Sequence, residues 1–431
     1  MVSRWYGIQR PPNRLTERGL CERQRKVDHR RDRADCRGGC IQSPGDAAVT
    51  PHHLPPLSKA YLSGSVPPES LHIRTLDAYE THGIHLLTDK KVLKIDRNDR
   101  KLVLASGEEL QYNRLVLATG GRPRSLPAAS AVSAATKNFS YLRTLQDAET
   151  IKQNLVTGKT LVVIGGGYIG LEVAAAAAKA GMQVTVLASS DRILDRVTAP
   201  PISEFFEHVH RTHGVDIQTN AHVNSLKLTA DNTMVEEVIC ADGRRFHSDL
   251  VVTGIGLVPN VELASEAHLQ VADGIVINSD MQTSDPLIMA AGDCAQFYST
   301  IYKREVRIES VPNALEHARK IAALLCGQPP RKEAAPWFWS DQYAVGLKMV
   351  GLSQGYDRIV VRGSTDKRDF TLFYLLKERV LAVDTVNRPV EFTLSKQIIT
   401  DGLPVDTQLL SDESVTLKEL VSAARATANA V

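Results

Sequence analysis

The sequence lacks several features that would assign it to a specialised class of protein. Its 431 residues contain no apolar run of the roughly 18 residues that a membrane-spanning helix needs. The Arg-rich start has no apolar segment of the kind that a signal peptide requires. Acidic and basic residues nearly balance, at 49 and 51, for a net charge of +2. We therefore expect a cytoplasmic protein with neither a membrane nor a nucleic-acid partner.

Cysteine is scarce and is not arranged for disulfide or metal chemistry. The sequence has no Cys-x-x-Cys and no Cys/His cluster at zinc spacing, and its six cysteines are Cys21, Cys36, Cys40, Cys240, Cys294 and Cys326. So few cysteines in so long a chain do not form a disulfide framework. Reduced thiols in a reducing compartment are the expectation.

Hydrophobic periodicity is absent from residues 1–51. Ten arginines lie between Arg4 and Arg37 with few apolar residues among them, so the segment can bury little surface and is predicted to be disordered. A basic nucleic-acid arm is the alternative. Such arms usually cluster their charge or interleave it with aromatic residues, whereas Trp5 and Tyr6 are the only aromatics here.

A glycine-rich turn between two predicted strands is the strongest signal in the chain. Residues 160–164 are apolar and β-branched, and Gly165, Gly167 and Gly170 follow in the spacing Gly-x-Gly-x-x-Gly. An Ala-rich helix is expected next, and residues 182–187 supply a second strand. This order predicts a βαβ unit that binds a dinucleotide, with the pyrophosphate at the helix N-terminus.

Each glycine has a separate predicted role. Gly165 permits the tight turn, Gly167 lets backbone N–H groups approach the pyrophosphate, and Gly170 allows the helix to pack closely on its strand. A carboxylate at the end of the second strand would select NADH, but this chain has Ala188 there. With Arg192 nearby, a 2′-phosphate is not repelled, so NADPH stays open beside NADH.

Shorter elements are predicted on both sides of this unit. The segments that precede it are expected strands at 84–87, 91–96, 101–104 and 112–118. Those that follow are a hairpin-like segment at 234–244, a strand at 249–256 and a helix at 314–325. Alternating apolar residues at 358–362 and 370–376 indicate a small antiparallel sheet in a third domain.

Seven short motifs in order carry a family resemblance. They are PPLSKAYL (55–62), ATG (118–120), GGGYIGLE (165–172), AGDCA (291–295), ESVPNA (309–314), PWFWSDQ (336–342) and VNRP (386–389). Over about residues 52–410 the chain resembles the two-dinucleotide flavoprotein reductases, in particular the ferredoxin and rubredoxin reductases of bacterial oxygenase systems. The lack of a Cys-x-x-Cys argues against a dithiol disulfide reductase of the same architecture.

The resemblance implies an α/β fold with two nucleotide-binding Rossmann-like domains, the first of them incomplete, and a C-terminal α+β reductase domain. The implied ranges are 52–123 with 255–326 for an FAD domain, 124–254 for an NAD(P) domain, 327–410 for the reductase domain and 411–431 for a tail. The implied activity is electron transfer from NAD(P)H through FAD to a ferredoxin or rubredoxin.

The resemblance also implies a set of site residues. Those assigned to FAD are Lys59, Val92, Thr119, Gly120, Arg143, Asp293 and Val311, and those assigned to the nicotinamide nucleotide are Gly165, Gly167, Ile169, Gly170 and Gly256. Two catalytic positions are implied, Glu172 near the nicotinamide and Trp339 beside the isoalloxazine. The alternatives are core positions for the two valines, a helix N-terminal acid for Glu172 and a structural aromatic for Trp339. No metal ligand is expected.

One part of the family pattern is missing. Similar reductases begin with a strand and a first Gly-x-Gly-x-x-Gly that bind the ADP half of FAD, and residues 1–50 supply neither. The residue types there are those that a shifted reading frame through GC-rich DNA would yield. The alternative function is therefore a nicotinamide-binding protein with defective FAD binding and little or no turnover.

Overall fold

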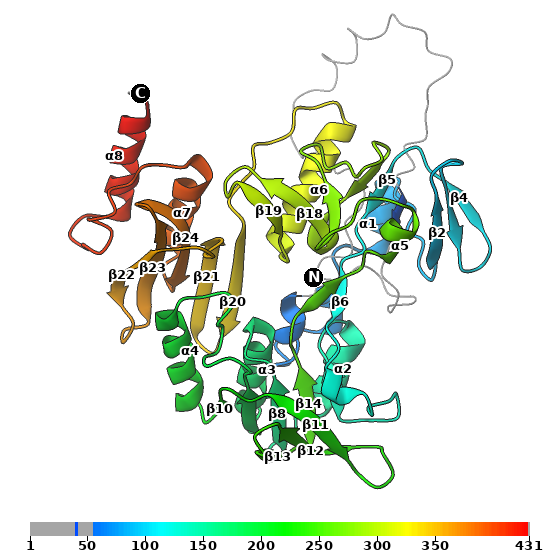
Figure 1. Ribbon diagram of the computed structural model, residues 1–431, viewed down its shortest axis with the longest axis vertical. Helices are drawn as coiled ribbons and strands as arrows, with labels where there is room; N and C mark the ends of the chain where they lie inside the picture. Colours follow the sequence, from blue (N-terminus) through cyan, green and yellow to red (C-terminus); the bar gives the residue numbers. More distant parts are fainter. Residues whose placement is uncertain (1–38, 42–54, 430–431) are drawn as a thin grey trace, which may run out of the picture.

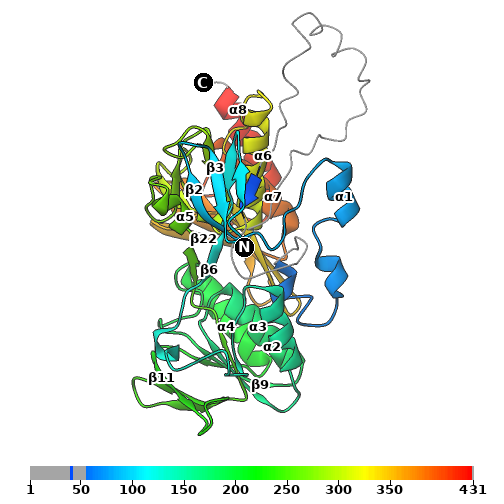
Figure 2. The same cartoon turned by 90° about the vertical axis from the view of Figure 1, so that its right-hand side faces the viewer.

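The structure is a computed structural model that describes residues 39–41 and 55–429 (Figures 1 and 2). These residues form three packed regions, each built around its own sheet or sheets. Within the described ranges, no helix is long and apolar enough to cross a membrane. The three regions are called here the nucleotide region, the second region and the C-terminal region.

The nucleotide region contains a parallel sheet of five strands in the order β10-β9-β8-β14-β7. The strands are β7 (Phe139–Tyr141), β8 (Thr160–Ile164), β9 (Gln183–Leu187), β10 (Asp216–Gln218) and β14 (Leu250–Thr253). Its helices are α2 (Leu145–Gln153), α3 (Tyr168–Lys179) and α4 (Pro200–Thr212). Central strand β8 is buried on both faces, which explains its continuous apolar run. The predicted βαβ unit is confirmed as β8, α3 and β9.

An antiparallel sheet of three strands covers the face of this parallel sheet to which Val162 and Ile164 contribute. It consists of β11 (Val223–Leu228), β12 (Val235–Cys240) and β13 (Arg245–His247). Val235 and Val238 pack in one apolar cluster with Val162 and Ile164 of β8. The hairpin expected around residues 234–244 is thus present as β12 and β13.

The second region holds three small sheets beside a long helix. A parallel sheet contains β1 (Gly39–Ile41), β5 (Leu115–Leu117) and β17 (Ile288–Ala290). One antiparallel sheet contains β2 (Val92–Asp96), β3 (Lys101–Leu104) and β4 (Glu109–Gln111). The mixed sheet has β16 (Ile275–Ile277), β18 (Ala295–Ser299) and β19 (Arg304–Arg307), and the helices are α1 (Leu76–Thr81), α5 (Glu262–Glu266) and α6 (Val311–Leu325). An antiparallel ribbon of β6 (Gly121–Pro123) and β15 (Leu257–Pro259) joins it to the nucleotide region.

Two expectations for the second region need correction. Residues 1–50 were predicted to contain no strand, yet Gly39–Ile41 pairs in parallel with β5, because even three extended residues can extend the open edge of a parallel sheet. The rest of that segment, residues 1–38 and 42–54, lies outside the described residues. The strand expected at 84–87 is absent: those residues are irregular, with His85 and Leu87 exposed and Ile84 and Leu86 partly buried, since a short apolar run without a pairing neighbour does not make a strand.

The C-terminal region is an antiparallel sheet of five strands in the order β20-β21-β24-β23-β22. They are β20 (Trp337–Gln342), β21 (Val345–Gly351), β22 (Arg358–Ser364), β23 (Asp369–Leu376) and β24 (Arg379–Val386), followed by α7 (Pro389–Asp401) and α8 (Leu417–Asn429). The antiparallel sheet predicted from residues 358–362 and 370–376 is confirmed. Residues 411–431, expected as a tail, contain α8, whose apolar face packs into the core of this region.

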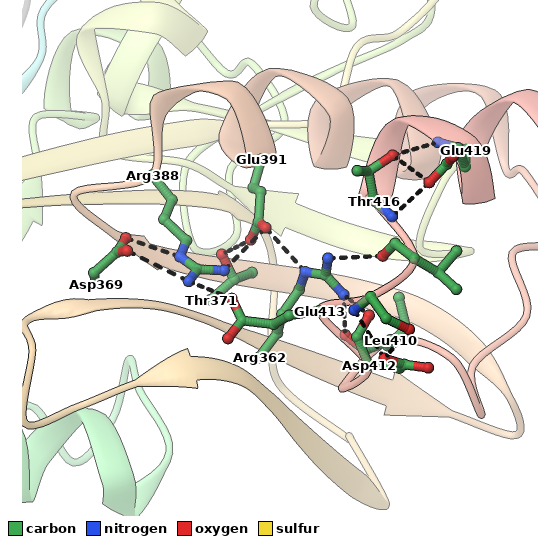
Figure 3. Close-up of polar contacts among 12 residues, drawn as sticks. Arg362, Asp369, Thr371, Arg388, Glu391, Leu410, Asp412, Glu413, Thr416 and Glu419 are labelled. Atoms are coloured by element: carbon green, nitrogen blue, oxygen red, sulfur yellow. Dashed lines mark hydrogen bonds and ion pairs between the residues drawn. The ribbon is translucent and has the colours of Figure 1, made fainter.

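A buried arginine fixes the loop between α7 and α8 to the sheet (Figure 3). The Arg362 guanidinium, 3% exposed, donates to the carbonyl oxygens of Leu410, Asp412 and Val415 and forms an ion pair with Glu391. These carbonyls belong to loop residues with no strand or helix partner. Arg362 therefore supplies the hydrogen bonds that secondary structure would otherwise provide.

The C-terminal sheet packs against α3 and α4 of the nucleotide region (Figure 1). The rings of Phe205 on α4 and Phe370 on β23 meet edge to face, 5.1 Å between centroids. The backbone N–H of Ala199 donates to the Tyr374 hydroxyl, which in turn donates to Asp384. Burial raises the pKa of Asp384 to about 7. Together the three regions confirm the predicted α/β class with its C-terminal α+β part.

Candidate functional site

The glycine turn between β8 and α3 has the geometry of a dinucleotide site. Gly165 has φ +116°, and a Cβ there would lie 2.4 Å from the Gly254 carbonyl oxygen. A Cβ at Gly170 would lie 2.2 Å from the Gly165 carbonyl oxygen, so α3 can lie this close to the turn only with a glycine at position 170. At Gly167, the N-cap of α3, an added Cβ would meet nothing within 4 Å. Open space therefore lies in front of unpaired N–H groups at the helix N-terminus, which fits a pyrophosphate.

Two further predicted residues border this turn. Ile169 is half-buried on the first turn of α3. Gly256 follows β14 with φ +111°, and a Cβ there would approach the guanidinium groups of Arg124 and Arg196 at 3.8 and 3.9 Å. Cationic side chains thus lie close to the turn, where an anionic ligand would gain from them.

The structure changes the expectation about a 2′-phosphate. Ala188 directly follows β9, is 3% exposed and donates its N–H to the Gln218 carbonyl. Arg192 is committed elsewhere: its guanidinium donates to the Thr198 carbonyl and the Ser203 hydroxyl and pairs with Asp195. It holds the loop before α4, so it does not offer a free cation to a nucleotide. What remains of the argument for NADPH is the missing acid at position 188.

Glu172 lies where α3 meets β20 of the C-terminal region and the segment that holds Ser58 and Lys59. Its carboxylate accepts from the Ser58 hydroxyl at 2.5 Å, the Lys59 ammonium at 2.9 Å and the Ser340 hydroxyl at 2.6 Å. The side chain is 2% exposed. A carboxylate with so little water is stable only with such partners.

The alternative of a helix N-terminal acid for Glu172 is wrong. Glu172 is the fifth residue of α3, and the first turn of that helix carries no acid. The dipole effect is confined to the first turn. Its position is explained by Lys59 and the two serines instead.

Trp339 lies beside this cluster in a row of aromatic rings. The Lys59 ammonium is 5.7 Å from the Trp339 ring centroid, and the rings of Trp337 and Trp339 are 5.7 Å apart. Trp337 also contacts Phe392 edge to face at 5.5 Å. We call Trp337, Trp339 and Phe392 the aromatic row. All three rings are half-buried.

Two more lysines lie over the aromatic row. The Lys348 ammonium is 5.5 Å from the Phe392 ring centroid, and that of Lys396 is 5.4 Å from the Trp337 ring centroid. A cation over a ring gains roughly 0.5–1 kcal/mol at such partly exposed sites. The row therefore combines flat apolar surface with positive charge.

A second cluster surrounds Asp293, which follows β17 in a short 3-10 turn, Gly292–Cys294. Asp293 is fully buried, and the nearest Arg143 nitrogen lies 3.9 Å from its carboxylate. The Gly292 N–H donates to His317 Nδ1 at 3.3 Å. Burial lowers the pKa of His317 to about 3, so its ring is neutral and available as an acceptor near pH 7.

The other predicted flavin residues differ in their surroundings. Thr119 is buried and donates to the Asn260 carbonyl at 2.6 Å, and Gly120 follows it with φ +59°. Val92 packs in the apolar core of the second region, in register with Leu104. Its position is that of a core residue, so its role beside the flavin stays a prediction. Val311 opens α6 and is half-buried.

The structure brings Lys59, Glu172 and Trp339 together, and it separately joins Arg143 to Asp293. Sequence reasoning missed Ser58 and Ser340 as partners of Glu172. Both lie inside recognised motifs, at 55–62 and 336–342, which was the available signal. Within residues 39–41 and 55–429, no group of three or more His, Cys, Asp or Glu side chains could hold a metal ion.

Comparisons with known proteins agree with this geometry. Residues 32–318 match the family described as pyridine nucleotide-disulphide oxidoreductase, and residues 337–421 match the family described as reductase C-terminal. The chain is 63% identical to putidaredoxin reductase of Pseudomonas putida, over 90% of this chain and 92% of that protein. It is 39% identical to rhodocoxin reductase of Rhodococcus erythropolis, over 88% of each. A crystal structure of a covalent putidaredoxin reductase–putidaredoxin complex superposes with a TM-score of 0.87 at 63% identity, covering 89% of this chain and 92% of that one.

Proposed function

The chain belongs to the pyridine nucleotide-disulphide oxidoreductase family, and on this premise we propose how it works as the reductase component of an oxygenase system. It is an oxidoreductase that passes electrons from NAD(P)H through FAD to a ferredoxin or rubredoxin. The observation that carries the proposal is the meeting of Lys59, Glu172 and Trp339 at one point. Lys59 lies in segment 55–62, Glu172 on α3 and Trp339 on β20.

Two nucleotides have places on this chain. The turn at Gly165, Gly167 and Gly170 holds the pyrophosphate of NAD(P)H, supported by the open space at Gly167. The buried Asp293 accepts hydrogen bonds from the hydroxyls of the flavin side chain, and Arg143 beside it balances charge. When bound, FAD accepts a hydride from the nicotinamide and releases the electrons one at a time.

Glu172 and Lys59 orient the reacting rings. The carboxylate lies on α3, the helix that follows the glycine turn, and so faces the nicotinamide end of a nucleotide bound there. Lys59 links it to segment 55–62, whose Leu57 and Tyr61 pack in the same core as α3. Two serine hydroxyls donate to the Glu172 carboxylate and hold it in one orientation beside the Lys59 ammonium.

The aromatic row is the proposed exit for electrons. Trp339 contacts the Lys59 side of the site, while Phe392 continues the row across the C-terminal region. The lysines over the row favour a redox partner with an acidic face, because opposite charges speed encounter and set its orientation. We also infer a cytoplasmic location, supported by the free thiols of Cys240, Cys294 and Cys326.

A second candidate function is nicotinamide binding with defective FAD binding. It is favoured by one observation, the lack of a first Gly-x-Gly-x-x-Gly in residues 1–50. Most of those residues lie outside the described part of the chain. The two functions predict different amounts of bound flavin.

The experiment is to measure bound FAD and NAD(P)H oxidation in one preparation. After desalting, the ratio of FAD to protein is determined, and electron transfer from NADH and NADPH to a ferredoxin and a rubredoxin is assayed with added FAD. A ratio near one with partner reduction supports the reductase. Tight NADH binding with a ratio near zero and no partner reduction at saturating FAD would establish the second candidate.

A further inference from the structure

A series of buried polar side chains extends away from Glu172. Ser340, which donates to Glu172, accepts a hydrogen bond from the Gln342 amide nitrogen at 3.0 Å. The Gln342 amide oxygen lies 2.7 Å from His210 Nε2. His210 and Ser340 are fully buried and Gln342 is 1% exposed. The series crosses from α3 through β20 to α4.

The direction of every hydrogen bond in this series follows from its partners. Because the Gln342 nitrogen donates to Ser340, its oxygen is the acceptor, so His210 Nε2 carries a proton. The other ring nitrogen, Nδ1, then accepts from the Tyr343 hydroxyl at 3.3 Å. Burial lowers the pKa of His210 to about 4, which agrees with a neutral ring. All four donors point the same way, from Tyr343 toward Glu172.

Such a one-way series does more than satisfy buried groups. Aligned hydrogen bonds polarise one another, so each donor strengthens the next. The last donor, the Ser340 hydroxyl, has its proton committed to Glu172 because Gln342 occupies its acceptor side. Without the Gln342 donor the hydroxyl could rotate away. His210 thus influences the orientation of the Glu172 carboxylate through three successive hydrogen bonds.

We propose that His210 is a positioning residue that fixes the Glu172 carboxylate through Gln342 and Ser340. This rests on the proposed function, in which Glu172 faces the nicotinamide. His210 touches neither nucleotide in this proposal. Its effect is to reduce the number of orientations in which the Glu172 carboxylate and the Lys59 ammonium meet the reacting rings.

The test uses the flavin-loaded protein and matched variants. His210→Leu removes the donor, whereas His210→Gln places an amide N–H where Nε2 stood. Tyr374→Phe is the control, because Tyr374 joins the same two regions through Ala199 and Asp384 without contacting the series. Flavin reduction by NADH is followed anaerobically by stopped flow, which separates the limiting rate from the half-saturating NADH concentration.

We expect His210→Leu to lower the limiting rate about two- to tenfold, the value of one net hydrogen bond. Ser340→Ala should do the same, and the double variant should be no slower than Ser340→Ala alone. His210→Gln should restore the rate. Tyr374→Phe should lower the unfolding temperature and leave the rate unchanged. If His210→Leu does not fold, Gln342→Leu breaks the series at the next link and takes its place.

Two results would overturn the proposal. One is a parental limiting rate in His210→Leu when Ser340→Ala is slow, and the other is losses that multiply in the double variant. The flavin-free protein gives a separate readout, since a double-mutant cycle on thermal unfolding measures coupling between His210 and Ser340. Additive destabilisation there would show that the series is not coupled. If NADH does not reduce the parent at all, the proposed function fails, while the unfolding cycle still decides whether the series exists.

Discussion

Gly167→Val separates nucleotide binding from folding. Gly167 has φ −85° and ψ 178°, a backbone conformation open to any residue, and an added Cβ would meet nothing within 4 Å. The fold should lose about 1 kcal/mol or less, the difference between Gly and an aliphatic residue at an N-cap. The branched side chain instead fills the space where the pyrophosphate meets the N-terminus of α3.

The expected loss of affinity is large by comparison. Displacing a pyrophosphate from two charge-assisted backbone hydrogen bonds, at roughly 1.5–3 kcal/mol each, forfeits about 3–6 kcal/mol. The dissociation constant for NADH should rise roughly a hundredfold to ten-thousandfold. Titration calorimetry gives the constant, and urea unfolding gives the stability of the same preparation.

Gly170→Ala is the matched control for this prediction. Its Cβ would lie 2.2 Å from the Gly165 carbonyl oxygen, so either helix α3 moves from β8 or the turn distorts. The control should therefore lose clearly more stability than Gly167→Val, which should lose about 1 kcal/mol or less. A folded Gly167→Val protein that binds NADH within threefold of the parent would refute the assignment of the turn as the nucleotide site.

Four further predictions address other parts of the chain. Ala188→Asp should raise the ratio of kcat/KM for NADH to that for NADPH, because the new carboxylate would repel a 2′-phosphate. Aspartate is chosen over glutamate because position 188 is buried and has little room. An unchanged ratio would count against placing the ribose 2′ position beside residue 188. Trp339→Ala should slow flavin reoxidation by a one-electron acceptor in stopped flow more than it lowers the unfolding temperature, and a parental rate would remove Trp339 from the electron path. Arg362→Met should cost about 3–5 kcal/mol in urea unfolding, because three carbonyls and a carboxylate lose a buried partner; a loss below 1 kcal/mol would contradict this. Asp384 has a pKa of about 7 in the folded state, above the ordinary 3.8, so the folded state binds more protons than the unfolded state between these pH values and the free energy of unfolding falls as pH rises from 4 to 7. Asp384→Asn should therefore be more stable relative to the parent at pH 8 than at pH 5. An equal stability difference between variant and parent at both pH values would refute the prediction.

The sequence predicted those parts of the fold whose signals are local. Strand β8, the glycine turn and α3 follow one another within twenty residues, so periodicity and glycine spacing are sufficient to place them. The segment at 84–87 shows the limit of the same reasoning. It is a short apolar run of the kind that occurs in strands, but a strand exists only with a neighbour to pair with, and pairing is a property of the fold.

Side-chain partnerships between distant segments were the part that sequence could not supply. Glu172 is 114 residues from Ser58 and 168 residues from Ser340. Each serine was visible inside a recognised motif, but nothing in residue spacing shows that both hydroxyls point at one carboxylate. Arg192 shows the same limit, because its place after β9 put a positive charge near a 2′-phosphate, while its hydrogen bonds go to the following loop.

The partners of Glu172 argue that this carboxylate is retained for function. Burying an ion pair usually contributes little net stability, because the desolvation of both charges offsets their attraction, and an apolar pair of similar volume often serves as well. Here the chain instead commits Lys59 and two buried serines to one carboxylate. These partners come from two segments that are distant in the sequence, 55–62 and β20. The packing of these two segments on α3 therefore also sets the orientation of the Glu172 carboxylate.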